Sequence, residues 1–302
     1  MPRPVDSPEP SLSILPLTAQ FISERQYLHG VSPKTVEWYN CPFRAFEPYL
    51  SPVTNEDGLR AALRGGVMKM AEAGNLLPTS INDYSRCLNA FLKWLREEGH
   101  ITHTIKIPKL KVPEKVPELL SDKQVAGIIQ FRAKKKIERR IHMMLLMILD
   151  TGMRVNEVLN VRKQDIDLDN LLITVQKGKG SKQRIVPMSL SFRKVIFKFL
   201  RTEPHPRSEY VFSTRDGAPQ TYRNAVRTLK DIGKSVGAPN IRFHLLRHQW
   251  ATHYLRSGGS VALLRKQLGH ADLSTVLTYE HIASSDLLKV HERHSLLAAI
   301  SS

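Results

Sequence analysis

The sequence predicts a mainly α-helical protein with two domains, the second of which carries a small β-hairpin or sheet as well as helices. Three observations favour this fold class. The chain has 302 residues, about twice the length of a usual single core. Apolar residues recur at helical spacing along most of it. One stretch, residues 101–117, lacks this periodicity and alternates lysines with prolines, which is typical of a connection between domains.

The first domain is expected at residues 13–100, after a loose, proline-rich arm at 1–12. Apolar spacing within this domain predicts four amphipathic helices. Ser32 and Pro33 form a typical helix start, and Gly99 a typical helix end. The four helices are expected near residues 17–27, 33–46, 57–72 and 80–98.

A basic linker at 101–117 then leads to the second domain at 118–302. Ser121 and Asp122 provide a start for its first helix. The nearly apolar run Ile141–Leu149 predicts a helix buried in the core, and this run is too short to span a membrane. The second domain is therefore expected to be mostly helical around one buried helix.

The exception is a predicted β-hairpin. Residues 171–175 and 183–186 are short runs of β-forming residues, and they flank a glycine-rich turn at 177–180. Three lysines lie in or next to this turn and are expected at the tip of the hairpin: Lys177, Lys179 and Lys182.

The charge of the chain indicates a polyanionic partner. Lys and Arg number 45 against 28 Asp and Glu, a formal net charge of +17, and the basic residues are threaded through apolar segments rather than gathered in a tail. Double-stranded DNA fits this charge, although RNA or an acidic membrane surface would satisfy charge alone. No secretion signal opens the chain, so a cytoplasmic location is expected. The two cysteines, Cys41 and Cys87, have no metal-ligand spacing and are expected to be reduced packing residues.

The first motif with chemical potential is Thr151-Gly152-Met153-Arg154-Val155-Asn156-Glu157. A helix that begins here places Arg154 near its N-terminus, where backbone and side-chain donors suit a phosphate. Glu157 is three residues on and is able to orient the guanidinium. Taken alone, the motif is better explained as a surface ion pair.

The turn lysines form the second motif. A flexible ammonium on a turn can enter a groove and give a proton to a leaving oxygen, but basic turns are usually only solvated. Both Lys177 and Lys179 are candidates for this role at this point.

The third motif is His244-Leu245-Leu246-Arg247-His248. Helical spacing puts His244 and Arg247 on one face and leaves Leu246 and Trp250 to pack on another. The first face is expected to be free for chemistry. Neither a nearby cysteine nor a metalloprotease motif accompanies these histidines, so neither a metal nor another cofactor is expected.

The fourth motif is Leu268-Gly269-His270-Ala271-Asp272 followed by Tyr279. Gly269 ends one helix, and Asp272 is able to cap the next, which would carry Tyr279. A tyrosine on a helix is by itself nearly always a packing residue.

Together the four motifs resemble the tyrosine recombinase (phage integrase) family, which includes the Xer-type recombinases. The resemblance lies in T-G-M-R-x-x-E-V-L, G-K-G-x-K-x-R-x-V-P, H-x-L-R-H-x-x-A-T-H and L-G-H-x-D-x-S-T-x-x-x-Y, in this order along the second domain. The first domain is similar to the family's helical, SAM-like core-binding domain. The resemblance implies a two-domain clamp on DNA, with residues 118–302 as the catalytic domain.

The resemblance also implies a role for each motif residue. The guanidiniums of Arg154 and Arg247 would bind the scissile phosphate, and Lys179 would protonate the leaving 5′ oxygen, since the G-K-G register favours it over Lys177. Tyr279 would be the nucleophile and form a 3′-phosphotyrosyl link. The two histidines of the motifs would assist proton transfer and phosphate binding; they are His244 and His270. Neither metal nor ATP is required.

In this family a homo-tetramer acts on two specific recombination sites through a Holliday junction. The tail at residues 286–302 is apolar enough to need a partner surface, and the resemblance implies docking on the neighbouring subunit, with folding back on its own domain as the alternative. Two other functions share parts of the pattern: strand relaxation by a type IB topoisomerase, and DNA binding by a regulator that lacks catalysis. All six catalytic positions are filled, which counts against the regulator.

Overall fold

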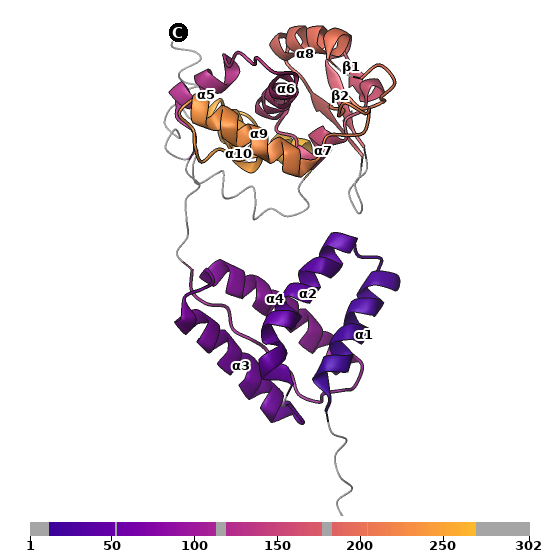
Figure 1. The fold of residues 1–302 in the computed structure, drawn as a ribbon, viewed down its shortest axis with the longest axis vertical. Coiled ribbons are helices and arrows are strands. Elements are labelled where there is room, and N and C mark those ends of the chain that lie inside the picture. Colours follow the sequence, from indigo (N-terminus) through magenta and orange to yellow (C-terminus); the bar gives the residue numbers. More distant parts are fainter. Residues whose placement is uncertain (1–11, 52, 113–118, 177–182, 204, 270–302) are drawn as a thin grey trace, which may run out of the picture. The chain divides into compact units, whose positions relative to one another are not determined.

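The computed structural model divides the chain into two compact units, Met1–Lys115 and Val116–Ser302, each with its own hydrophobic core. Figure 1 shows the helices and strands of each unit. The predicted fold class, mainly helical with a small sheet, is confirmed. The residues that the structure describes are 12–51, 53–112, 119–176, 183–203 and 205–269.

Four helices form unit 1, close to the positions that the apolar spacing predicts. Ser32 caps the second helix by accepting the backbone N–H of Thr35 at 3.2 Å, and Gly99 has a positive φ of 75° just after the fourth. The core is aromatic at its centre, where Phe21 meets Phe43 and Phe91 edge to face. The helices are α1 (Ile14–Tyr27), α2 (Pro33–Leu50), α3 (Glu56–Ala73) and α4 (Pro78–Glu97).

Residues 101–112, which the sequence assigns to the linker, lie along α4 as an extended strap. Ile101, Ile105 and Ile107 are buried in the core of unit 1. Two asparagines of α4 hold the backbone of the strap. Asn89 exchanges two hydrogen bonds with Ile107, at 2.9 and 3.0 Å, and Asn82 exchanges two with Leu110, at 2.8 and 3.0 Å. In its described part, the strap is a packed element of unit 1.

Unit 2 is built around α6, which contacts α5, α7, α8, α9 and α10 and lies at the centre of the unit (Figure 1). The nearly apolar run predicted as a buried core helix falls within α6, so this prediction is confirmed. Ser121 and Gln124 form a capping box at the start of α5. The helices are α5 (Asp122–Ile129), α6 (Lys136–Thr151), α7 (Val155–Leu159), the 3-10 turn η1 (Lys163–Asp165), α8 (Leu190–Thr202), α9 (Tyr222–Ser235), α10 (Phe243–Arg256) and α11 (Val261–Leu268).

The sheet of unit 2 has three antiparallel strands in the order β1-β2-β3. The predicted hairpin corresponds to β2 (Leu172–Val175) and β3 (Arg184–Pro187), with Val175 opposite Arg184. The first strand, β1 (Ile166–Asp167), has only two residues, and the sequence pattern did not predict it. The turn between β2 and β3 lies outside the described residues.

The cysteine prediction holds for one residue and fails for the other. Cys87 is buried in unit 1, where burial raises the pKa of its thiol to about 12. Cys41 is exposed, so the expectation that it packs in the core is wrong. No helix in the described part of the chain is both long and apolar enough to cross a membrane.

Candidate active site

Arg154 lies where α6 ends and α7 begins. Gly152 ends α6 in the left-handed conformation, with a φ of 67°, and Arg154 directly precedes α7. The Glu157 carboxylate accepts the backbone N–H of Arg154 at 2.7 Å and a hydrogen of its Nη1 at 3.1 Å. The prediction that Glu157 orients this guanidinium is confirmed.

Arg247 comes from α10 and is only 1% exposed. Its Nη1 donates to the carbonyl of Gly152 at 2.8 Å, and its Nη2 donates to the carbonyl of Leu268 at 2.9 Å. The sequence pattern placed Arg247 on an open face of its helix. This is wrong, because the side chain is as deeply buried as Leu246 and carbonyl oxygens surround its charge.

The two arginines meet at one backbone atom. The Nη1 of Arg154 donates to the Leu268 carbonyl at 3.1 Å, the same oxygen that Arg247 binds. Leu268 is the last residue of α11, and Gly269 ends that helix with a φ of 64°, as the sequence predicts. The structure therefore brings the first, third and fourth sequence motifs together at the end of α11.

Arg184, in β3, lies with Arg154 and Arg247, and these three residues are called the arginine cluster below. It donates Nη1 and Nη2 to the two carboxylate oxygens of Glu157, at 2.7 Å each, and its Nε to the carbonyl of Gln267 at 2.8 Å. Glu157 is thus shared between two arginines. Burial alone would raise the pKa of this carboxyl group, but the hydrogen bonds from Arg184 and Arg154 outweigh it and hold the pKa below its usual range.

Two histidines of α10, His244 and His248, have lowered pKa values. Desolvation lowers the pKa of His244, and the positive charges of Arg247 and Arg154 lower it further. Desolvation, His244 and Arg247 lower the pKa of His248 to about 4. The two rings meet edge to face, with centroids 4.6 Å apart. The lowered pKa favours the neutral form of His244, which is the form that is able to accept a proton.

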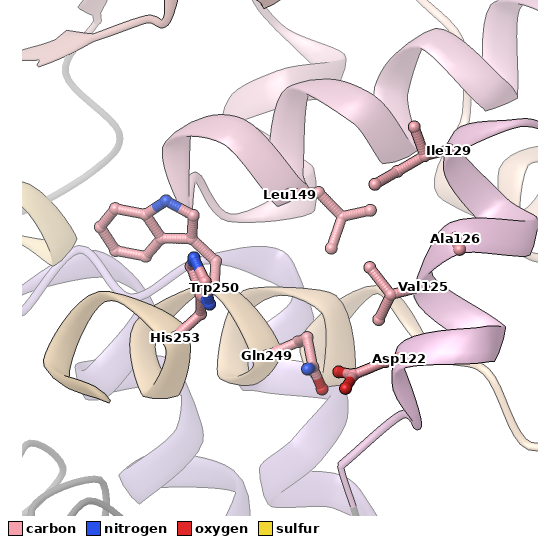
Figure 2. Close-up of a pocket in the computed structure, with 8 residues that line it drawn as sticks. All are labelled: Asp122, Val125, Ala126, Ile129, Leu149, Gln249, Trp250 and His253. Atoms are coloured by element: carbon pink, nitrogen blue, oxygen red, sulfur yellow. The ribbon is translucent and has the colours of Figure 1, made fainter. Parts of the chain in front are cut away.

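Trp250 fixes the backbone next to the cluster. Its Nε1 donates to the Asp150 carbonyl at 2.9 Å, and its ring fills the space over Gly152. The same ring lines a cavity of about 400 Å³ between α5, α6 and α10. Figure 2 shows Val125, Ile129 and Leu149 pointing toward one another across this cavity. None of the predicted site residues is among the described side chains that line it.

Three of the six predicted site residues lie outside the described residues: Lys179, His270 and Tyr279. Two of the other three, Arg154 and Arg247, meet at the Leu268 carbonyl. The third, His244, is near enough to both for their charges to lower its pKa. Within the described part of the chain, no three His, Cys, Asp or Glu side chains are grouped to hold a metal ion.

Comparison with known proteins assigns the family. A sequence model of the phage integrase family matches residues 118–286. Tyrosine recombinase XerA of Pyrococcus furiosus is 31% identical over 274 residues, which are 89% of this chain and 91% of that protein. The chain belongs to the phage integrase family of tyrosine recombinases. Tyrosine recombinase XerD of Listeria innocua is 28% identical to this recombinase, with 87% of this chain and 93% of that protein covered.

Solved structures share the fold of this recombinase. The integrase of transposon Tn1549, in a complex with transposon right end DNA, covers 92% of this chain and 98% of its own, with a TM-score of 0.75 and 18% identity. The XerH recombinase bound to its difH substrate after cleavage covers 91% of this chain and 83% of its own, with a TM-score of 0.69 and 21% identity. The resemblance to this family that the sequence motifs indicate is confirmed, and the chain is a site-specific recombinase.

Sequence reasoning missed one member of the cluster, Arg184. The residue stands in the basic motif that follows the hairpin turn, and no role was assigned to it there. A signal was present, because Arg184 is one of the fixed positions of the motif G-K-G-x-K-x-R-x-V-P. The acceptors that hold it, Glu157 and the Gln267 carbonyl, are far away in the sequence and come together only in the fold.

Proposed function

We propose that this recombinase cuts and rejoins double-stranded DNA at specific sites through a covalent link between Tyr279 and the 3′ phosphate of the cut strand. The observation that carries this proposal is the meeting of Arg154 and Arg247 at the Leu268 carbonyl. That carbonyl lies directly before Gly269 and His270, a pair that belongs to the family motif carrying Tyr279.

The arginines would bind the scissile phosphate, Arg154 by direct hydrogen bonds and the buried Arg247 by its positive charge behind them. Glu157 and the Leu268 carbonyl use the Nη1 hydrogens of Arg154, which leaves its Nε and Nη2 hydrogens for a phosphate oxygen. The side chain is 38% exposed. Negative charge on the non-bridging oxygens grows in the transition state, and each donor aimed at it contributes about 3 kcal/mol in comparable oxyanion sites.

The bond changes balance without a cofactor. The Tyr279 oxygen attacks the phosphorus, the bond from phosphorus to the 5′ oxygen breaks, and Lys179 protonates that leaving oxygen. His244 and His270 would take up the tyrosine proton and support the phosphate. The ester keeps the energy of the broken bond, so the 5′ hydroxyl of a partner strand can attack it without ATP. This chemistry requires no metal.

The assembly is part of the same proposal. The net charge of +17 suits DNA, and the structures of the Tn1549 integrase and of XerH contain DNA. Unit 1, with the strap at 101–112 packed in its core, would form the core-binding domain, and residues 118–302 the catalytic domain. A homo-tetramer would exchange strands in two steps through a Holliday junction on paired sites. The motif set occurs once in the sequence, so the exchange of two strands would require several chains.

The deciding experiment is a covalent capture. Fragments of the source genome are incubated with the wild-type chain, and the DNA that stays attached after denaturation is sequenced to find the site. A nicked suicide substrate carrying that site is then offered to the wild type and to Tyr279→Phe. We expect the wild type to form an adduct on a denaturing gel and the variant to form none, while both bind the site, because phosphate contacts elsewhere carry the affinity.

Three results would contradict the proposal. An adduct in Tyr279→Phe would remove this tyrosine from the reaction. Absence of any adduct in a folded wild-type chain that binds DNA would favour a regulator without catalysis. Relaxation of a supercoiled plasmid without joining of two sites would favour a topoisomerase.

A further inference from the structure

The last turn of α11 is held by three arginines. The final carbonyls of an α-helix have no donor within the helix and carry the negative end of its dipole. Here the Gln267 carbonyl accepts from Arg184 at 2.8 Å, and the Leu268 carbonyl accepts from Arg154 at 3.1 Å and from Arg247 at 2.9 Å. The helix end therefore acts as a common anchor for guanidiniums from three different elements.

The three arginines differ in how much of each reaches the surface. Arg154 is 38% exposed, whereas Arg184 is 11% exposed. Arg184 also spends its Nε and both terminal nitrogens on Gln267 and on the two oxygens of Glu157. It is thus poorly placed to bind DNA itself. Its acceptors lie next to the proposed phosphate site, because Glu157 also binds Arg154 and Gln267 directly precedes Leu268.

We propose that Arg184 is a positioning residue for DNA cleavage: it holds the Arg154 guanidinium through Glu157 and the last turn of α11 through the Gln267 carbonyl. This inference rests on the proposed function, because it assigns Arg184 to the same phosphate site. No step of the reaction passes through Arg184.

The geometry explains why the residue has to be an arginine. Only a planar guanidinium can make two parallel bonds to a carboxylate and a third bond from Nε to a carbonyl in another direction. A lysine keeps the charge but offers one nitrogen. Arg184 also lies against Gly269, since a Cβ on that glycine would come within 3.2 Å of the Arg184 Cδ and Nε. The Arg184 side chain therefore packs against Gly269, the residue directly before His270 in the sequence.

The alternative is that Arg184 only stabilises the fold. A variant of a second arginine–glutamate pair in the same unit serves as the control that distinguishes this role from positioning. Arg139 donates its Nε to Glu203 in the same unit, and this pair joins α6 to the end of α8 away from the arginine cluster. Arg139→Lys therefore controls for the loss of a partly buried arginine–glutamate pair. Melting temperature, DNA affinity and the single-turnover rate of adduct formation are measured for the wild type, Arg184→Lys and Arg139→Lys on the captured site.

We expect Arg184→Lys to bind the site as the wild type does and to cleave it between about tenfold and a hundredfold more slowly, as for a misplaced catalytic group. Arg139→Lys should cleave at the wild-type rate. Wild-type cleavage by Arg184→Lys would overturn the inference while leaving the proposed function intact. A loss of cleavage that comes with a loss of DNA binding and a much larger fall in melting temperature than in the control would also overturn it. Failure of the wild type to form adduct would remove the proposed function and this inference with it.

A second variant tests whether Arg184 acts through Glu157. Glu157→Gln keeps the shape of the side chain and removes the charge that links the two arginines. If Arg184 acts through Glu157, the double variant should cleave little more slowly than the slower single variant. Independent, multiplicative losses would contradict the proposed path.

The pH dependence of the cleavage rate is a further test, because a purely structural role of Arg184 does not predict a change in it. The charged groups that act on Glu157 are Arg184 from β3 and Arg154 at the start of α7. Weakening the Arg184 pair raises the pKa of the buried Glu157, so the carboxylate is protonated at a higher pH than in the wild type. The cleavage rate of Arg184→Lys relative to the wild type should therefore fall as the pH is lowered. A constant ratio would count against the inference.

Discussion

At Gly152 the backbone and a side chain from another helix both exclude any residue but glycine. The φ of 67° lies in the left-handed region, and a Cβ at this position would come within 2.2 Å of the Trp250 ring. The carbonyl of the same residue accepts a hydrogen bond from Arg247. Because Arg154 follows two residues later, the geometry of this glycine sets the distance between the two arginines.

We predict that Gly152→Ala destabilises the protein by about 2–5 kcal/mol, from the left-handed backbone and the clash together. Gly237→Ala is the matched control. Gly237 has a φ of 71° in the same unit, but no atom lies within 4 Å of a Cβ there, so the backbone term of about 1–2 kcal/mol remains alone. Chemical denaturation of both variants measures the difference. Equal losses of stability in the two variants would show that the Trp250 ring moves aside without destabilising the protein.

The sequence predicted the residues whose motif spacing is informative and missed the one whose partners are distant. Arg154 and Glu157 are one helical turn apart, so their contact follows from local geometry. The burial of Arg247 did not follow, because its acceptors at Gly152 and Leu268 are supplied by other helices. Arg184 was missed for the same reason.

At the scale of elements, the strap at residues 101–112 shows how a segment without periodicity is held in place. Alternating isoleucines face the core, while Lys106, Lys109 and Lys111 are exposed. At its start, the Glu56 carboxylate accepts the backbone N–H groups of Thr102 and His103. Burial alone would raise the pKa of Glu56, but these bonds and the His103 ring lower it to about 2. Side chains replace the missing strand partner for the strap backbone.

We predict that Asn89→Ala destabilises unit 1 by about 1–3 kcal/mol, because the N–H and the carbonyl of Ile107 both lose their partner. Asn40→Ala is the control in the same unit. Asn40 donates only to the Val36 carbonyl in its own helix, and a change within about 0.5 kcal/mol is expected. Denaturant melts of the two variants, with hydrogen exchange at Ile107, test this. Unchanged protection of Ile107 in Asn89→Ala would contradict the role of the side chain.

Long elements with apolar periodicity were predictable from the sequence. Short elements, and segments held only by contacts with distant parts of the chain, were not. The helices of unit 1 and the long α6 follow from apolar spacing alone. The two-residue strand β1 has no periodicity to detect, and it forms because β2 offers an edge for pairing. The strap was predicted as a linker because its lysines and prolines outnumber its isoleucines. Its burial depends on α4, which the local composition does not reveal.

At the scale of the whole molecule, the chain consists of two units that each bury a separate core. In the described residues of unit 2, the core already closes around α6 with side chains from α5, the sheet and α8 to α10. The match to the family model ends at residue 286, where the predicted tail begins. Residues 286–302 lie outside the described residues, and their sequence includes the apolar residues Leu287, Leu288, Val290, Leu296, Leu297, Ala298 and Ile300.

We predict that this tail docks on the neighbouring subunit of the assembly, because it offers more apolar surface than a solvated end requires. Deleting residues 286–302 should leave a protein that binds one site and forms some Tyr279 adduct, but that pairs two sites poorly and recombines little. Gel shift, adduct yield and recombination are measured on one preparation. A second variant keeps the tail and replaces Leu287, Leu288 and Leu296 with serine, and it should behave in the same way. Normal recombination by the folded truncated protein would defeat docking in trans. A large fall in the melting temperature of the isolated chain would instead make the tail a part of its own core, because a contact between subunits contributes nothing to a monomer.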